Sequence, residues 1–149
     1  MTRGLLKDQK GTEVVEFAII SVLLFLVLFG IIDFGILLFD KQVITNASRE
    51  GARRGIVQNT PRISESEIQT VVKTYCQNYL VNFPYTPLSN PVVENLTATG
   101  NNKCIEFGDS LRVTASYPYK FLALPNVVSA GGGSLGNITL VAQTTMKCE

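Results

Sequence analysis

The chain has 149 residues, of which 46% are hydrophobic and 17% are charged, and its mean hydropathy is +0.21. This composition is more apolar than that of an average soluble domain, but too polar for a protein that crosses a membrane many times. The net charge of +1 creates no field that would attract nucleic acid. Histidine, a GxSxG motif and a P-loop are all missing from the sequence, which therefore predicts a non-enzymatic protein without a cofactor.

The segment before the apolar run is short, polar and basic. Arg3, Lys7 and Lys10 outnumber Asp8 here, and short basic flanks of a membrane span stay on the cytoplasmic side. We expect residues 1–10 to be disordered. The N-terminus should then lie in the cytoplasm and about 110 residues on the outer side, by the positive-inside rule.

The apolar residues are concentrated in residues 17–39, FAIISVLLFLVLFGIIDFGILLF, which carry one formal charge, Asp33. A helix of this length is roughly 35 Å long, enough to cross a hydrocarbon core of about 30 Å. A core helix of a soluble protein would not be apolar on every face. A cleavable signal peptide would have a shorter apolar region that ends in small residues. The sequence predicts a membrane span that is retained.

The helix need not end at the membrane surface, because no proline occurs before Pro61. Residues 45–55, TNASREGARRG, place small residues at spacings of three and four, which lets another helix or sheet approach closely. The charged residues lie on the other face, where Glu50 can pair with the arginines three and four positions later. One interpretation is a solvated helix face, and the other is a contact with a neighbouring subunit. The residues of that contact would be Arg49, Glu50, Gly51 and Arg53.

The rest of the chain predicts a small head. Ser64 and Glu67 have the spacing of a capping box at the start of an amphipathic helix over residues 64–82. Alternating apolar residues then predict strands, and a long loop with three successive glycines precedes the last strand. The expected strands are 92–99, 104–107, 110–118 and 137–146, and the expected loop is 120–136. The fold class is α+β, with a long N-terminal transmembrane helix extending into a head in which one amphipathic helix packs on a short antiparallel sheet.

Three cysteines, Cys76, Cys104 and Cys148, all follow the predicted span. In an oxidising compartment two would pair and one would be left over. If the last two strands are antiparallel neighbours, Cys148 lies near the start of the earlier strand. That alignment favours a Cys104–Cys148 disulfide over a Cys76–Cys104 disulfide. With neither histidine nor a CxxC motif, no metal site is predicted.

KGTEVVEF, residues 10–17, places a glycine and two glutamates directly before the span. Taken separately, the glycine could be a hinge and each glutamate an interfacial charge. Together with the basic leader, the late FGIIDFG and the TNASREGARRG stretch, they resemble the processing site and N-terminal helix of type IV prepilins. The segment is most similar to the TadE-like family of tight-adherence (Tad) pilus systems. The resemblance is close over residues 11–55 and only architectural beyond them.

This resemblance implies that a membrane-embedded prepilin peptidase cuts between Gly11 and Thr12. Glycine suits this position because it has no Cβ and allows close approach to the backbone. Glu16 would be the fifth residue of the mature chain and would neutralise the terminal amine of a neighbouring subunit. Phe17 matches the aromatic residue that the family has next. The implied parts are a leader over residues 1–11, a long helix over 12–58 with its span at about 17–39, and a head over 59–149.

Asp33 lies about five residues past the middle of the span, roughly 7 Å from the bilayer centre. An acid at that depth is expected to face protein or water rather than lipid. We therefore predict a contact between Asp33 and another subunit. The alternative is protonation or local bilayer thinning around a monomer.

Two functions follow from the sequence. The first is a non-catalytic minor pilin or pseudopilin in Tad pilus assembly, single-pass in the bacterial inner membrane with a periplasmic head. Its partners would be prepilin peptidase, other pilins, the Tad inner-membrane assembly proteins and membrane lipid, with no role for nucleic acid. The second is an uncleaved, membrane-anchored periplasmic accessory or binding protein. A recovered chain that begins at Thr12 would favour the first, and one that begins at Met1 the second.

Overall fold

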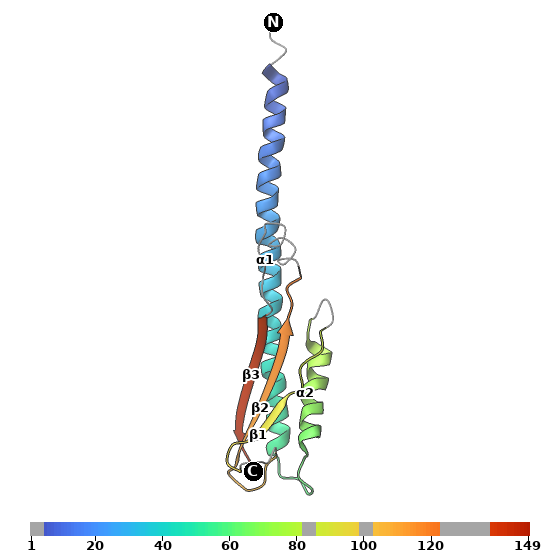
Figure 1. The fold of residues 1–149 in the computed structure, drawn as a ribbon, viewed down its shortest axis with the longest axis vertical. Coiled ribbons are helices and arrows are strands. Elements are labelled where there is room, and N and C mark those ends of the chain that lie inside the picture. The colour runs from blue at the N-terminus through green and yellow to red at the C-terminus, as the bar shows by residue number, and fades with distance from the viewer. Residues whose placement is uncertain (1–4, 82–85, 99–102, 123–137) are drawn as a thin grey trace. The chain divides into compact units, whose positions relative to one another are not determined.

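The structure is a computed structural model that describes residues 5–81, 86–98, 103–122 and 138–149 (Figure 1). Its elements are α1 (Leu5–Ile56), α2 (Glu65–Tyr79), β1 (Val92–Asn95), β2 (Ser110–Tyr119) and β3 (Ile138–Lys147). The chain divides into two compact units. The first consists of Met1–Gly35 and Phe121–Leu135, and the second of Ile36–Lys120 and Gly136–Glu149. The predicted α+β class, with a long apolar N-terminal helix and an antiparallel sheet, is confirmed.

Helix α1 is one continuous helix of 52 residues. The prediction of a disordered leader is wrong for residues 5–10, which belong to α1, while residues 1–4 lie outside the described residues. A single glycine costs a helix only about 1 kcal/mol, so Gly11 does not stop it. The helix ends at Ile56, two residues before the expected boundary and ahead of Pro61, which disfavours helix at the residue before it.

Helix α2 begins with the predicted capping box. The Ser64 hydroxyl accepts the backbone N–H of Glu67, and the Glu67 carboxylate accepts the N–H of Ser64 at 2.8 Å. The backbone N–H of Ser64, and secondly its hydroxyl, donate to the Glu67 carboxylate and hold the pKa of Glu67 below its ordinary value. The helix ends at Tyr79 rather than at residue 82. The N–H of Val81 donates to the side chain of Asp40 in α1, so it is not used to extend α2.

The sheet has three antiparallel strands in the order β1-β2-β3. Leu111 of β2 lies opposite Met146 of β3, and Tyr117 lies opposite Leu140. Along β2 buried and half-buried residues alternate strictly, as expected for a strand with one face on a core. The predicted pairing of the last two long strands is therefore correct.

Two strand predictions are wrong, one in its extent and one altogether. The strand expected over residues 92–99 ends at Asn95, whose side-chain oxygen accepts the N–H groups of Thr97 and Ala98 at 2.9 and 3.0 Å and so turns the chain. The strand expected over residues 104–107 is a loop. Of the loop expected over residues 120–136, residues 123–136 lie outside the described residues.

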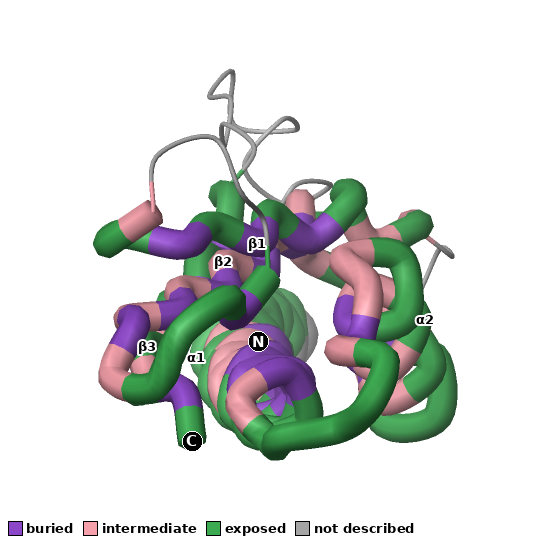
Figure 2. Tube along the Cα trace, turned by 90° about the horizontal axis from the view of Figure 1, so that it is seen from below, coloured by how far each residue is buried: buried purple, intermediate pink, exposed green. Residues whose placement is uncertain are grey.

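The core lies where the C-terminal half of α1 meets both α2 and the sheet (Figure 2). A Cβ built on Gly51 would overlap the side chain of Val72 in α2 and would lie 3.5 Å from Val113 in β2. Ile44 and Ala47, on the preceding turns of α1, are fully buried. The long helix is thus a central part of the head, whereas the sequence predicted that α2 would pack on the sheet with α1 beside it.

Candidate functional site

The predicted cleavage site lies within helix α1, so the peptide bond between Gly11 and Thr12 has helical geometry. Gly11 is exposed, and a Cβ built on it would meet no atom within 4 Å. No described side chain therefore obstructs the approach of an enzyme to this position. Helical hydrogen bonds engage the backbone groups of the bond, so attack on the carbonyl carbon requires local unwinding, which glycine makes easier.

Glu16 and Phe17 are both exposed, Phe17 to 73%. Within the described residues, Glu16 forms no hydrogen bond or ion pair. Thr12 and Glu16 are four residues apart and so lie on the same face, one helical turn from each other. An amine created at Thr12 would therefore be within one turn of the carboxylate of the same chain, as well as open to a neighbouring copy.

Most of the apolar part of α1 is uncovered, except around Asp33. Most of the large apolar side chains from Val14 to Phe39 are exposed, including Ile31 at 69%. Among the described residues, α1 is the one helix whose length and apolar composition would let it cross a membrane. Side chains of this kind leave water when a bilayer surrounds them, which is consistent with membrane anchoring.

Asp33 differs from its neighbours in α1 because it is fully buried. Its Oδ1 atom accepts the backbone N–H of Leu122 at 3.1 Å. Irregular backbone such as this segment is not stable against lipid unless protein or water covers it. At Asp33, therefore, the chain itself covers one face of the helix and supplies a partner for the acid. The predicted contact of Asp33 with another subunit stays a prediction.

The sequence analysis missed a second buried acid in α1. Asp40 is fully buried, and its Oδ1 atom accepts the N–H of Val81 at 2.9 Å, while Oδ2 has no hydrogen-bond partner among the described residues. Beside it, the Lys41 amine donates to the carbonyl oxygen of Val141 in β3. The spacing of seven residues between Asp33 and Asp40 could have indicated that both acids are on the same side of α1, because residues seven apart lie on one helix face.

The stretch REGARRG has two faces with different roles. Gly51 and Gly55 are buried, and a Cβ on Gly55 would come within 2.5 Å of Leu111 and 2.7 Å of Ile68. The small residues therefore accommodate the chain's own α2 and β2. Arg49, Glu50 and Arg53 lie on the other face and are exposed. A subunit contact through these charges stays a prediction.

The ion pairs predicted for Glu50 are not formed in the described part of the chain, where the recorded pair is Arg112–Glu94 at 3.8 Å. Exposed pairs of this kind contribute little, because solvent competes with them and long side chains lose entropy when they are held together.

Cys104 and Cys148 form a disulfide with a Cα–Cα separation of 5.9 Å, the pairing that the strand alignment favoured. Cys76 is a free, buried thiol on α2. Burial, and secondarily the negative charge of Asp40, raises the pKa of Cys76 to about 11. A thiol that stays protonated at neutral pH is a poor nucleophile, so this residue has the character of a core side chain.

These features define a class: an α+β head joined to a helix whose N-terminal half is long and apolar enough to cross a membrane. The family model for TadE-like proteins matches residues 11–53, which confirms the family resemblance over that segment and associates it with Tad pili. The match starts at Gly11 and ends within α1, so it includes the predicted cleavage site, the apolar stretch and the small-residue face. Neither the curated proteins nor the solved structures contain a match.

Proposed function

We propose that this protein is a non-catalytic minor pilin or pseudopilin that takes part in assembly of a Tad pilus and is matured by cleavage after Gly11. The observation that carries the proposal is the start of the TadE-like match at Gly11, immediately before the exposed apolar part of α1. The sizeable head, with its own core and disulfide, favours a minor or assembly role over that of a main filament subunit.

Maturation would be a hydrolysis by prepilin peptidase. Water adds to the carbonyl carbon of Gly11, the bond to the Thr12 nitrogen breaks, and the products are a Gly11 carboxylate on the leader and a Thr12 ammonium on the mature chain. Gly11 contributes an unobstructed backbone and a low barrier to unwinding. The chain supplies no catalytic group in this scheme, because the chemistry belongs to the peptidase.

Glu16 would then set the register between subunits. An ionised carboxylate in hydrocarbon is costly unless a positive charge pairs with it. Its exposed position on α1 leaves it free to meet the Thr12 amine of an adjacent copy. This pairing fixes one helix axially against the next, while the surrounding apolar side chains pack without directional preference.

The Cys104–Cys148 disulfide supports a periplasmic location for the head, because disulfides persist in oxidising compartments. The basic leader supports a cytoplasmic N-terminus. An inner-membrane protein with its N-terminus inside and its head outside satisfies both conditions.

The test is the intact mass of the protein recovered from cells with and without the peptidase. We expect a chain that begins at Thr12 when the peptidase is present and at Met1 when it is absent. A Gly11→Val variant should retain the leader. Gly35→Val is the matched control, since Gly35 also lies in α1 with nothing within 4 Å of a built Cβ, and it should be processed normally.

The alternative is an uncleaved, membrane-anchored periplasmic accessory protein. One observation favours it: the predicted scissile bond lies inside a continuous helix rather than at its end. Recovery of full-length chains from piliated cells that contain the peptidase would establish this alternative and refute the pilin function. An Asp33→Leu variant that assembles normally would separately refute the predicted subunit contact of that acid.

A further inference from the structure

The largest exposed apolar side chain of the head lies in the loop between β1 and β2. Phe107 is 87% exposed, the highest value for a large apolar residue in the part of the chain that the structure describes. Ile105 is 43% exposed and Glu106 is also exposed. Three adjacent residues thus present an apolar surface with one negative charge.

Hydrogen bonds and a disulfide hold the backbone of residues 104–109 of this loop. The Asp109 carboxylate accepts the N–H groups of Ile105 and Glu106 at 3.2 and 3.1 Å and the side-chain amide of Asn95 at 2.9 Å. Gly108 makes the turn with a φ of 89°, a conformation that favours glycine, and the Cys104–Cys148 disulfide joins the loop to the end of β3. A side chain that is presented rigidly loses little conformational entropy on binding.

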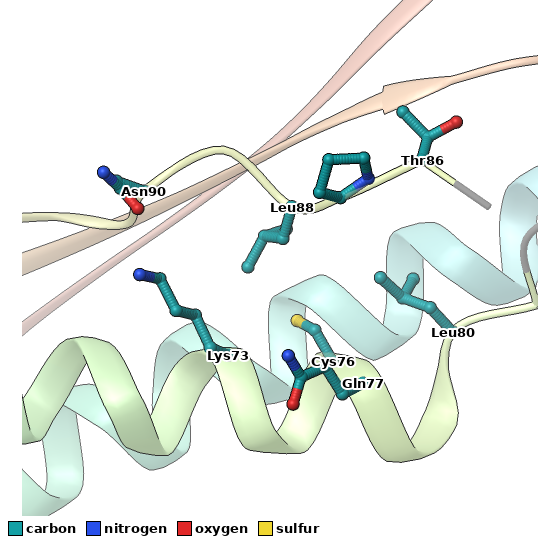
Figure 3. A pocket seen from close by; sticks show the side chains of 8 residues that line it. Lys73, Cys76, Gln77, Leu80, Thr86, Leu88 and Asn90 are labelled. Atoms are coloured by element: carbon teal, nitrogen blue, oxygen red, sulfur yellow. The ribbon is translucent and has the colours of Figure 1, made fainter.

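A pocket of about 340 Å³ lies between α2 and residues 86–90 (Figure 3). Leu80, Pro87 and Leu88 provide apolar walls, and Leu88 points towards α2. Lys73 and Asn90 lie at one end of the pocket. The pocket is large enough for an aromatic ring, and its charged residue is positive.

The loop and the pocket lie at opposite ends of the second compact unit. Next to the loop, the N–H of Glu149 donates to the carbonyl oxygen of Ile56, the last residue of α1. At the other end of the unit, the N–H of Val81, the residue after the pocket residue Leu80, donates to Asp40. Ile56 follows Asp40 by sixteen helical steps in α1, a distance of roughly 24 Å. The end of the pocket at Leu80 is therefore far from the Phe107 of the same chain.

We propose that Phe107 of one copy inserts into this pocket of a second copy, with Glu106 beside Lys73. The proposal rests on the proposed function, because assembly into a pilus brings copies together. A projecting residue on one copy and a receiving pocket on the next form a heterologous contact, which joins the two copies head to tail. The opposite charges of Glu106 and Lys73 fix the orientation of the insertion.

Two other hollows of the head fit Phe107 less well. The hollow that includes Arg62 lies at the same end as the loop, and Arg62 already donates to the carbonyl oxygens of Ile56 and Glu149. The hollow lined by Tyr75 and Tyr79 contains no charged side chain to pair with Glu106.

The experiment places a benzophenone-bearing amino acid at position 107 of the full chain in piliated cells, followed by irradiation and mapping of the crosslink. We expect a product of two copies joined to residues 73–90. The Glu106→Lys variant should lower its yield by about tenfold, as expected when an interface charge pair is replaced by a repulsion. Adding Lys73→Glu should restore most of the yield. Adding Lys120→Glu, an equal charge change at an exposed residue outside the pocket, should not.

Several results would overturn the proposal: no crosslink between copies, a crosslink to a different protein, a crosslink outside residues 73–90, or no rescue by Lys73→Glu. Intact mass and an intact disulfide in every variant establish that the head has folded. If cleavage after Gly11 and piliation proceed normally without the crosslink, the inference fails and the proposed function stands. If uncleaved chains still give the crosslink at residues 73–90, the contact stands and the proposed function fails.

Discussion

The two halves of α1 are parts of one helix with opposite relations to their surroundings. In residues 11–35 the large apolar side chains are exposed. In residues 36–56 one face of the helix is buried, and small and medium side chains form that face. Ile31 is 69% exposed and Ile44 is fully buried. The helical backbone satisfies its own hydrogen bonds in both halves. What distinguishes the two halves is therefore the size and placement of their side chains.

The two halves should differ most in the free energy of unfolding that is lost when Ile31 or Ile44 is truncated to alanine. Ile44→Ala removes a fully buried side chain and leaves a cavity, so we expect the free energy of unfolding of the head to fall by about 3–4 kcal/mol. Ile31→Ala is the matched change in the other half and should alter the free energy of unfolding by less than about 0.5 kcal/mol. Denaturant unfolding of the full chain in detergent, followed by tyrosine fluorescence, measures both. Equal losses would show that the two halves do not differ as described.

The glycines provide a second comparison between the halves. A Cβ on Gly55 would press on Leu111 and Ile68, and a larger side chain would force the helix away from the sheet. We expect Gly55→Val to destabilise the head by about 2–3 kcal/mol, the usual cost of overpacking a tight interface. Gly35→Val meets open space and should be tolerated. The same unfolding measurement applies, and a stable Gly55→Val protein would contradict the close packing of α1 on β2.

A third comparison between the halves concerns Asp40, an acidic residue in the buried half. Asp40→Ala leaves the N–H of Val81 without its acceptor, which should cost about 1–2 kcal/mol. Asp40→Asn keeps an acceptor for that N–H and removes a buried charge whose second oxygen has no partner among the described residues. The Asn variant should therefore be at least as stable as the parent chain. If both variants lose the same free energy, the carboxylate charge itself is needed.

The local elements could be predicted from the sequence where a local interaction determines them. The capping box of Ser64 and Glu67 fixed the start of α2 to within one residue, and strict alternation located β2. The loop at residues 104–107 was mistaken for a strand because Ile105 and Phe107 favour strands locally. Its conformation depends on Asp109 and on a disulfide to a residue 44 positions away.

Of the candidate site, the sequence located Gly11, the apolar span and the small-residue face, since each has a composition or spacing that can be read directly. It did not show which surface the small residues meet, because a spacing of three and four does not distinguish the chain's own α2 from a neighbour. Asp40 was missed for the same reason: its partner, the N–H of Val81, is 41 residues away and belongs to the end of another helix.

The last comparison is a pH dependence and concerns Cys76, which faces the buried half of α1 from α2. Its pKa is raised from 9.0 to about 11, mainly by burial, so the folded chain keeps the thiol proton at a pH where the unfolded chain loses it. The stability that this group contributes is therefore complete below pH 9 and is lost as the pH rises from 9 to 11. Unfolding of the parent chain and of Cys76→Ala, compared from pH 7 to 11, isolates the effect, because tyrosines and lysines titrate equally in both. The difference in free energy of unfolding between the parent chain and Cys76→Ala should become smaller above pH 9. Parallel curves would show that the thiol is not shielded from water, and that α2 covers this part of α1 less tightly than the burial of Cys76 indicates.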